Sequence, residues 1–389
     1  MSLSNITLTA SVRQNLLSLQ GTADLLATTQ GRLATGKKVN SALDNPTNFF
    51  TAAGLDARAS DISNLLDSIG NGVQVLQAAN TGITSLSKLV DTAKSIANQV
   101  LQQPSGYTAK STVTSAAALG GTAANLVDGV TIKSGQTIIV AANGSLPALT
   151  VTIGASESLD QLNTALAAGN LTASLDSANK LVITTTNDYA SSTIGAVTVG
   201  STPGTATFGA AVAPVADAVS QATRASLVSQ YNQIISQITT TAQDASFNGI
   251  NLLNGDTLKL VFNETGKSTS TITGVTFSPA GLGLAALASG TDFLDNFSTN
   301  SVLTKLNTAS TTLRSQASAF GANLSIVQIR QDFNKNIINV LQTGSSALTL
   351  ADSNEEAANS QALSTRQSIA TSALSLANQS QQSVLQLLR

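Results

Sequence analysis

One stretch of the chain, from Leu55 to Val100, carries a seven-residue repeat of apolar side chains that few folds can accommodate. The repeat advances by alternating steps of four and three residues, with one polar member and an extra three-residue step after Ile83. Its members are Leu55, Ala59, Ile62, Leu66, Ile69, Val73, Leu76, Asn80, Ile83, Leu86, Val90, Ala93, Ala97 and Val100. Such a repeat predicts a helix of about 45 residues, roughly 68 Å long, that packs against other helices along its whole length.

Similar repeats near both ends of the sequence could supply those partners. The N-terminal repeat contains Val12, Leu16, Leu19, Ala23, Leu26, Gln30 and Leu33. A returning repeat contains Val302, Leu306, Ala309, Leu313, Gln316 and Phe320, and continues after a stutter with Leu324 and Val327. The last segment has a broad apolar face that includes Ile369, Ala373, Leu376, Val384, Leu387 and Leu388. A single amphipathic helix gains most of its stability from packing this kind of face, so these helices are expected to associate.

Prolines and composition divide the chain into segments. Pro46 disfavours the helical conformation of Asn45 and marks a break, and Pro104 ends the long helix. We expect a helix over 1–44, a long coiled-coil helix over 45–103 and an inserted β-rich domain over 104–214. After these we expect a helix and β-hairpin over 215–300. The chain should then return in a coiled-coil helix over 301–345 and end in a terminal helix over 346–389. The predicted fold is mainly α, a long antiparallel coiled-coil bundle with a small inserted β-rich domain and a β-hairpin.

Short β-branched runs between turn residues indicate the strands of the inserted domain. The runs are Val130–Ile132, Thr137–Val140, Leu149–Ile153, Leu181–Thr186 and Ile194–Val199, with a short helical pattern over Leu159–Ala167. Leu258–Phe262 and Thr271–Phe277 predict the hairpin, because a loop containing Gly266 joins them. No constellation of side chains in this domain points to a ligand.

The composition excludes several function classes. The chain has no His and no Cys, which rules out Ser-His and Cys-His nucleophiles and zinc sites built on those residues. Gly31–Lys37 resembles a phosphate loop, but Lys38 stands where Ser or Thr must meet magnesium. A net charge of −2 gives no indication of nucleic acid or an anionic membrane as partner. The sequence has no apolar run of about 18 residues and no basic, apolar leader, so we expect neither membrane insertion nor a secretory signal peptide.

Short motifs at the two ends of the chain point to a family. The N-terminal ones, within residues 1 to about 102, are Arg32-Leu33, Gly36, Asn40-Ser41-Ala42, Asp44 and Asn71-Gly72. The C-terminal ones, within about 302 to 389, are Ala377-Asn378-Gln379 and Val384-Leu385-Gln386-Leu387-Leu388-Arg389. Phe247-Asn248-Gly249 and Leu282-Gly283-Leu284 lie between them. In this order the motifs resemble bacterial flagellin, and Asn45-Pro46-Thr47-Asn48-Phe49-Phe50 is similar to its alphaproteobacterial members.

The resemblance implies a structural subunit that self-assembles into the helical filament of the bacterial flagellum for motility. Such subunits are exported unfolded through the flagellar type III apparatus without a cleaved signal, and they lie outside the cell in the filament. The implied partners are other copies of the chain, the filament cap protein, the hook–filament junction proteins and an export chaperone at the C-terminus. The resemblance implies no enzymatic activity and no cofactor.

The family also assigns roles to the repeats. Residues 1–44 and 346–389 would form the inner tube of the filament, with assembly contacts at Val12, Leu16, Leu19, Ala23, Leu26, Leu33, Ile369, Ala373, Leu376, Val384, Leu387 and Leu388. The inner-domain seam would join Leu55, Ile62, Leu66, Ile69, Val73, Leu76 and Ile83 to Leu306, Leu313 and Phe320. This sequence departs from most members in one respect, because its β-rich module interrupts the two inner-domain helices, with the second helix at 215–246.

Three alternatives compete with a filament subunit. A hook–filament junction protein shares the terminal helices but would act as an adaptor. A flagellin-like protein with a zinc protease in its variable domain would need His, which the chain lacks. An unrelated coiled-coil adhesin would usually carry a signal peptide.

One stretch of the long helix bears on immune sensing. In flagellins that the vertebrate Toll-like receptor detects, a contact stretch resembles Leu-Gln-Arg-Val-Arg-Glu-Leu-Ala. The matching residues here are Leu86–Ala93, where Lys88 and Val90 replace both arginines. Lysine and valine lack the planar fork of donors that arginine offers, so the resemblance implies a weak response.

Overall fold

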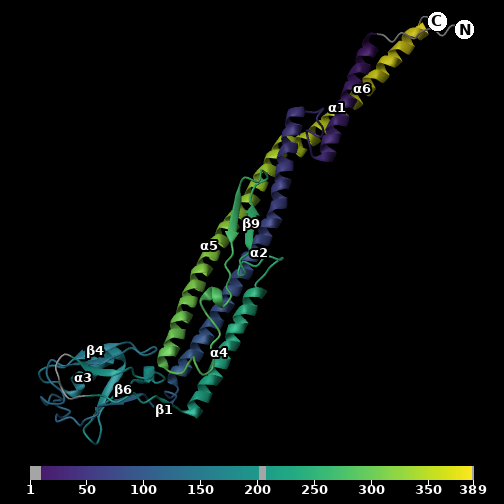
Figure 1. Cartoon of the computed structure of the whole chain (residues 1–389). Helices are drawn as coiled ribbons and strands as arrows, with labels where there is room; N and C mark the ends of the chain where they lie inside the picture. Colours follow the sequence, from purple (N-terminus) through teal and green to yellow (C-terminus); the bar gives the residue numbers. More distant parts are fainter. Residues whose placement is uncertain (1–9, 201–206, 388–389) are drawn as a thin grey trace. The chain divides into compact units, whose positions relative to one another are not determined.

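A computed structural model gives the structure of the protein and describes residues 10–200 and 207–387, most of them in helices (Figure 1). The chain divides into two compact units. The first contains the described residues up to Asn71, residues 260–270 and those from Ile326 on, and the second contains residues 72–259 and 271–325. Two long helices, α2 (Pro46–Gln102) and α5 (Asn296–Thr349), contribute to both units. The mainly helical class, with long helices toward both ends and a small β-rich middle, is confirmed.

The predicted break at Asn45-Pro46 is the start of α2. The side-chain oxygen of Asn45 accepts a hydrogen bond from the backbone N–H of Asn48 at 3.0 Å, as an N-cap residue does. Pro46 occupies the first helical position, where its missing N–H costs nothing and its fixed φ suits the helix. The two residues therefore begin the long helix, and the connection over 36–45 joins it to the preceding helix, which ends at Thr35.

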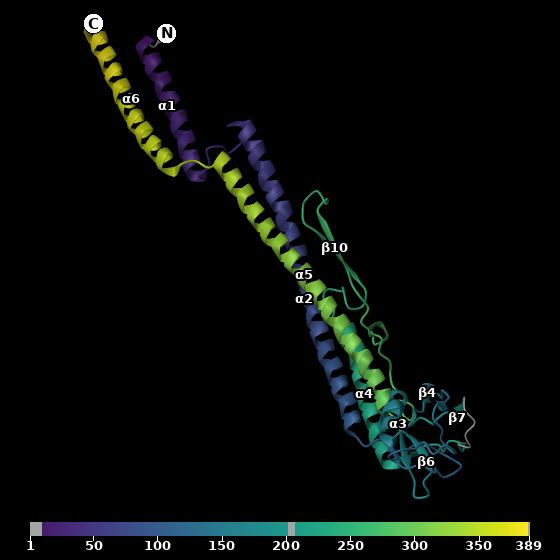
Figure 2. The same ribbon diagram turned by 90° about the vertical axis from the view of Figure 1, so that its left-hand side faces the viewer.

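In the first unit, α1 (Ala10–Thr35) lies along α6 (Ser353–Leu387), and the two run antiparallel (Figures 1 and 2). Asp352 caps α6 by accepting a hydrogen bond from the backbone N–H of Asn354 at 2.9 Å. Arg32, near the end of α1, forms an ion pair with the largely buried Glu356 at 3.3 Å. The ion pair fixes the alignment of the two helices at the end next to their connections.

The same unit contains the paired parts of α2 and α5. A Cβ at Gly344 would lie 3.5 Å from Leu55, and one at Gly70 would lie 3.8 Å from Gln331, so the helices are antiparallel. Ala59, Ile62 and Leu341 form the buried centre of this pair, with Leu55, Ile337 and Ile338 packed around it. The loop of the hairpin β9 (Thr257–Val261) and β10 (Thr269–Thr273) is held by Asn334, which donates to the carbonyl of Phe262 at 2.9 Å.

The second unit brings α4 (Ala218–Asp244) beside the later part of α2 and the first part of α5 (Figures 1 and 2). The α4 side chains that are buried there include Leu227, Val228, Tyr231, Ile235 and Ile238. Gly82 on α2 allows close approach, because a Cβ at this position would lie 2.6 Å from both Ala245 and Leu253. The 3₁₀ helix η3 (Ala280–Leu282) lies in the connection between the hairpin and α5.

The inserted domain belongs to the second unit. Its elements are β1 (Tyr107–Ala109), β2 (Thr112–Thr114), β3 (Thr137–Val140), β4 (Leu149–Thr152), α3 (Leu159–Leu166), η1 (Ala167–Gly169), β5 (Leu171–Leu175), β6 (Leu181–Thr185), η2 (Asn187–Tyr189), β7 (Val197–Gly200) and β8 (Val215–Ala216). The described strands form two antiparallel three-stranded sheets, β2-β6-β5 and β4-β3-β7, and a connecting ribbon, β1-β8. A single apolar cluster, which includes Leu126, Ile138, Leu162, Leu171 and Ile183, forms the core of this domain.

Most of the predicted strands appear with shifted ends, but Val130–Ile132 is not a strand. One carboxylate oxygen of Asp128 accepts hydrogen bonds from the backbone N–H groups of Val130, Thr131 and Ile132 at 2.8, 2.7 and 3.0 Å. These groups are therefore turned toward the carboxylate and cannot continue a sheet ladder. The sequence pattern also missed β5, whose strand Leu171–Leu175 pairs along its whole length with β6.

Candidate assembly surfaces

Only part of the N-terminal repeat on α1 is turned inward. Val12 is buried, and Leu19, Ala23 and Leu26 are half-buried on the side that lies along α6. Leu16 and Leu33 are exposed, as are Leu17 and Leu25, which the repeat did not include. Of the assembly contacts expected on α1, four therefore lie in or near the contact with α6 in the same chain. The other two remain available to a neighbour.

The corresponding face of α6 is turned outward. Ile369 and Leu376 are 64% and 69% exposed, and Ala373 between them is exposed as well. Leu363, Ala370 and Leu374 are half-buried instead, at steps of seven and four residues, which place them on one side of a helix that packs on one partner. The expected contacts at Val384 and Leu387 involve side chains outside the described ones, and Leu388 lies outside the described residues.

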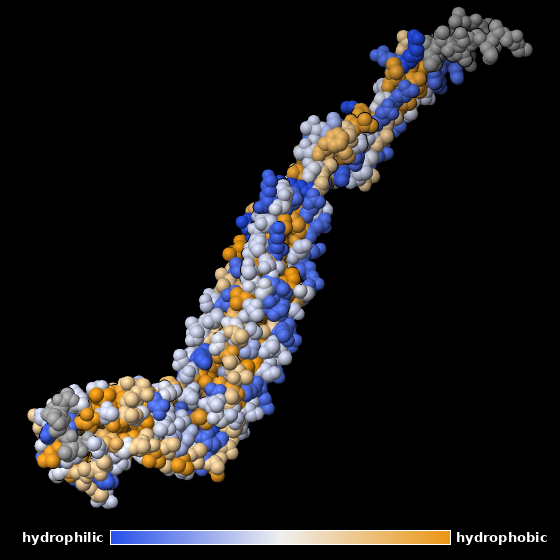
Figure 3. Space-filling model, viewed as in Figure 1, coloured by the Kyte–Doolittle hydropathy of each residue, from blue (hydrophilic) through white to orange (hydrophobic). Residues whose placement is uncertain are grey.

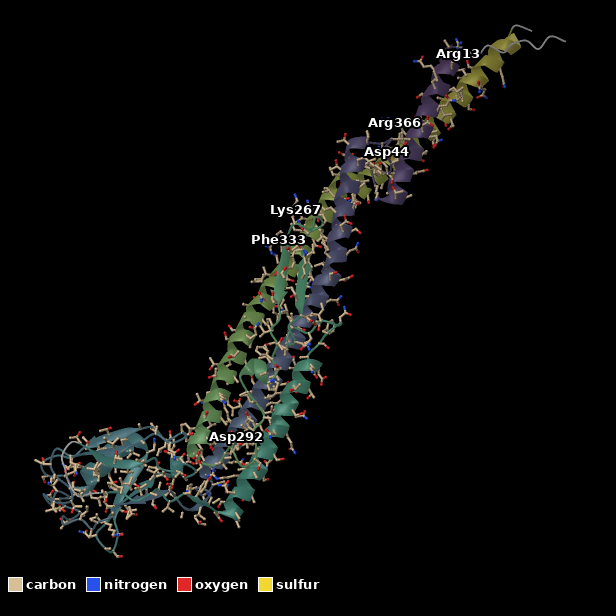
Figure 4. The ribbon with its side chains drawn as sticks, viewed as in Figure 1. Arg13, Asp44, Lys267, Asp292, Phe333 and Arg366 are labelled. Carbon is tan, nitrogen blue, oxygen red and sulfur yellow. The ribbon has the colours of Figure 1, made fainter. Side chains whose placement is uncertain are left out.

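The connections at the base of the α1–α6 pair are joined through their backbones. The N–H of Lys38 donates to the carbonyl of Thr349 at 2.7 Å, and the N–H of Ala351 donates to the carbonyl of Gly36 at 3.0 Å. In the same connection, the backbone N–H groups of Ser41 and then Asn40 hold the pKa of the Asp44 carboxyl below its ordinary value. Asp44 is labelled in Figure 4.

The expected seam residues line the inner faces of α2 and α5. Ile62, Ile69, Val73, Leu76 and Ile83 on α2 are buried, and Leu55 and Leu66 are half-buried. On α5, Leu306, Leu313 and Phe320 are buried. Asn80 is exposed, however, and Ala79 is fully buried in its place. The extra three-residue step therefore falls between Leu76 and Ala79 instead of after Ile83.

The stretch matched to the immune contact is only partly on the surface. Lys88 is exposed, but Val90 is fully buried in the seam of α2. An arginine placed at Val90 would bury an unpaired charge, so this position cannot offer a surface contact as the sequence match suggested. The expectation of a weak response then depends on Lys88 alone.

Three neighbouring residues of the inserted domain contact the start of α5. The ring of Tyr189 stacks on that of Phe297, with centroids 4.5 Å apart. Asn296 donates to the Asp188 carboxylate at 3.0 Å, and the Asp295 carboxylate accepts hydrogen bonds from the backbone and hydroxyl of Ser191. These contacts add to the two chain connections and hold the inserted domain on α5.

A buried arginine joins the elements at the same place. Arg224 on α4 donates to the carbonyl of Pro104 at 2.7 Å and to the carbonyl of Phe293 at 2.8 Å, and it is 1% exposed. Burial lowers its pKa, while the charge of Asp295 acts in the opposite direction. Arg224 therefore ties the residues after α2 to those before α5. No sequence pattern marked the contacts of Arg224 or the contact of Asp295 with Ser191, because these partners are far away in the chain.

Sequence reasoning also missed an exposed stripe on α5, made of Ile326, Ile329, Phe333 and Val340. Their spacing of three, four and seven residues was the available signal. Apolar side chains break the largely polar surface of the helical part of the molecule in several places (Figure 3). Within the described part of the chain, no helix is long and apolar enough to cross a membrane, and no acidic cluster suited to a metal ion occurs.

Comparison with known proteins gives matches at both ends of the sequence. The family "Bacterial flagellin N-terminal helical region" matches residues 6–118, and "Bacterial flagellin C-terminal helical region" matches residues 303–388. The chain is also similar to three proteins from Caulobacter vibrioides. It is 33% identical to flagellin FljM, 32% to flagellin FljK and 30% to flagellin FljO, each over 165 residues. The match covers 42% of this chain and 59% of each relative's length.

The fold and the matched regions define a class of proteins whose two ends form long paired helices on either side of a β-rich middle. The family matches cover α1, α2 and the short strands β1 and β2 at one end, and most of α5 with α6 at the other. The chain belongs to the bacterial flagellins, and its similarity to the Caulobacter proteins agrees with the predicted alphaproteobacterial type.

Proposed function

We propose that this chain is a structural subunit that self-assembles into the helical filament of the bacterial flagellum and serves motility. The observation that carries the proposal is the pairing of the two matched ends, with apolar side chains left exposed on both helices. Leu17 on α1 and Leu376 on α6 are each more than two-thirds exposed, at 68% and 69%. Exposed apolar side chains in this number mark surfaces that associate.

The family supports the remaining parts of the proposal. The subunit would be exported unfolded by the flagellar type III apparatus and would reside outside the cell. Its partners would be other copies of the chain, the cap protein, the junction proteins and a chaperone that covers the C-terminal segment before export. The relatives are named flagellins, and no observation favours a hook–filament junction adaptor. Catalysis forms no part of this proposal.

Removal of residues 375–389 tests the proposal broadly, and the expected result is a soluble chain that no longer polymerises. A narrower test replaces Ile369 and Leu376 by Ser together. Each side chain contributes about 1.5 to 3 kcal/mol when it is fully buried, so the double variant should fail to form filaments. Its α1–α6 pair should persist, because Leu363, Ala370 and Leu374 on the other face are unchanged.

The control replaces Gln361 and Gln379 by Ser, because both are exposed on α6 and lose a long side chain without losing an apolar one. Electron microscopy of the concentrated protein gives the readout, and circular dichroism checks that each variant has the helix content of the wild type. Normal filaments from the Ile369→Ser/Leu376→Ser variant would contradict the proposed role of this face. A wild-type chain that never polymerises would contradict the function itself.

The proposed chaperone site has its own test. A pull-down with residues 350–389 as bait should recover the export chaperone from cells that produce it. If the full chain recovers the chaperone and the segment does not, the binding site lies elsewhere in the chain.

A further inference from the structure

Between Ile326 and Val340, α5 carries two apolar stripes. The first faces α2 and contains the buried Val327 and Leu341. The second, which we call the α5 ridge, consists of Ile326, Ile329, Phe333 and Val340, whose exposed fractions are 52%, 65%, 52% and 66%. At about 100° per residue, the ridge lies roughly 120° around the helix from the seam. The first unit therefore presents a line of large apolar side chains that its own helices do not cover.

Phe333 of the ridge lines an open cavity of about 250 Å³ between α2, α5 and the hairpin loop. Figure 4 shows Phe333 close to the end of the hairpin that carries Lys267. Two arginines line the cavity, and only one has a carboxylate partner. Arg58 pairs with Glu264 at 2.8 Å, whereas Arg330 lies over the ring of Phe262 at 5.9 Å and forms no ion pair with any residue that the structure describes. The apolar ridge thus lies beside a cavity in which Arg330 has no carboxylate partner among the described residues.

The outer face of α2 carries mainly small or polar side chains, unlike the large apolar ones of the α5 ridge. Its exposed residues, on the side away from the seam, are Phe50, Gly54, Ala57, Asp61, Asn64 and Ser68. A Cβ at Gly54 would meet nothing within 4 Å, so the face is open around its small residues. Asp61 lies in the middle of this face and has no ion-pair partner among residues 10–200 and 207–387.

We propose that the α5 ridge of one copy packs against this outer face of α2 in a neighbouring copy, with Arg330 beside Asp61. Large side chains would meet small ones, and the two uncompensated charges would have opposite signs. A ridge-to-ridge contact would instead bring two Arg330 side chains together with no acid between them. The proposal rests on the proposed function, which makes a second copy the partner. Because the contact joins different faces of identical chains, it does not pair off into closed dimers and can repeat along a filament.

Disulfide cross-linking tests the contact directly, since the chain has no cysteine of its own. Ile329→Cys and Ala57→Cys variants are mixed, polymerised and oxidised, and dimers are analysed by mass spectrometry. We expect cross-linked dimers that contain one chain of each variant. The control pair, Lys335→Cys with Ala57→Cys, should not cross-link, because Lys335 lies on the other flank of α5. Filaments without the mixed dimer, or Ile329→Cys chains that cross-link to each other, would overturn the inference.

Charge reversal gives a second test that does not depend on oxidation. Arg330→Glu and Asp61→Arg should each raise the critical concentration for polymerisation by about fivefold or more. Combining them should bring it back to within about twofold of the wild type. Lys335→Glu is the matched control and should leave it unchanged. A double variant that assembles no better than the worse single variant would refute the pairing. Wild-type filaments would then still support the proposed function, whereas their absence would refute that function itself.

Discussion

Asp295 and Ser191 are 104 positions apart in the chain and share two hydrogen bonds. One carboxylate oxygen of Asp295 accepts both from Ser191, from its backbone N–H and from its hydroxyl. The other oxygen accepts from the backbone N–H of Ser298 at 2.9 Å, in the first turn of α5. A single carboxylate that is 2% exposed therefore caps a long helix and fastens the inserted domain to it.

Replacing Asp295 by Ala should lower the free energy of unfolding by about 2 to 4 kcal/mol, because it removes a helix cap and leaves the half-buried Ser191 groups without their acceptor. Ser191→Ala keeps the cap and should cost about 1 to 2 kcal/mol. Urea denaturation followed by circular dichroism measures both. The control is Asp188→Ala, which removes only the exposed bond to Asn296 and should cost less than about 0.5 kcal/mol. Equal losses for Asp295→Ala and Ser191→Ala would show that the cap contributes nothing.

Arg224→Lys should lower the free energy of unfolding by about 2 to 3 kcal/mol. The guanidinium reaches the carbonyls of Pro104 and Phe293 at once, and a single ammonium group cannot replace this planar fork. Arg314→Lys is the control, since Arg314 bonds only to Ser310 one turn earlier in its own helix. The same denaturation experiment measures both variants. If Arg224→Lys lowers the free energy of unfolding by less than about 0.5 kcal/mol, the hydrogen bonds of Arg224 do not stabilise the connection between the residues after α2 and those before α5.

The helices were predictable because their repeats recur over many residues, so that single exceptions do not obscure them. The exposure of Asn80 shows where the prediction of buried positions from the repeat fails. A four-and-three count reaches Asn80, whereas the structure buries Ala79, one position earlier. A small residue such as alanine carries little hydropathy signal, and only the packing of α2 decides between the two positions.

Strands and long-range hydrogen bonds were harder to predict, because the residues that determine them lie outside the strand or helix concerned. Val130–Ile132 has β-branched residues, but the preceding Asp128 captures its N–H groups. Arg224 acts through partners that are at least 69 positions away, and Asp295 fastens the inserted domain through Ser191, which is 104 positions away. The α5 ridge did carry a signal in its spacing, but the stronger seam on the same helix masked it. For the assembly contacts, the sequence identified apolar positions but not the face of the helix on which each lies.

The Asp128 turn predicts a pH dependence. Partial burial raises the pKa of this carboxyl, but hydrogen bonds from Val130, Gly120, Ile132 and Thr131 outweigh that effect and bring it to about 2, from an ordinary 3.8. The native state therefore holds the charged form more strongly than the unfolded chain does. After allowance for solvent screening, this contributes on the order of 1 kcal/mol above the ordinary pKa, and the contribution is lost as the pH falls through about 2.

The comparison that isolates this contribution is between the wild type and Asp128→Asn. The variant should melt at a lower temperature at pH 6, and the difference should shrink toward zero between pH 4 and pH 2. Scanning calorimetry at several pH values measures it, with each pair of samples in the same buffer. A difference that stays constant down to pH 2 would show that the charge of Asp128 contributes nothing to the stability of the turn.

Deleting residues 108–213 should preserve filament assembly and thin the outer surface of the filament. The seams of α2 and α5 lie outside the deleted segment, and Tyr107 pairs with Ala216 across the β1–β8 ribbon. Paired strand residues are only about 4.5 to 5.5 Å apart, so a short Gly-Ser linker can join the cut ends. The deletion also removes Tyr189 and Ser191, which leaves Phe297 and Asp295 uncovered at the start of α5.

Phe297→Ser should therefore accompany the deletion to prevent aggregation, and Phe297→Ser in the full-length chain is the control. Electron microscopy of both proteins gives the readout. Loss of filaments from the deleted chain alone, with export intact, would show that the inserted domain takes part in the contacts between subunits.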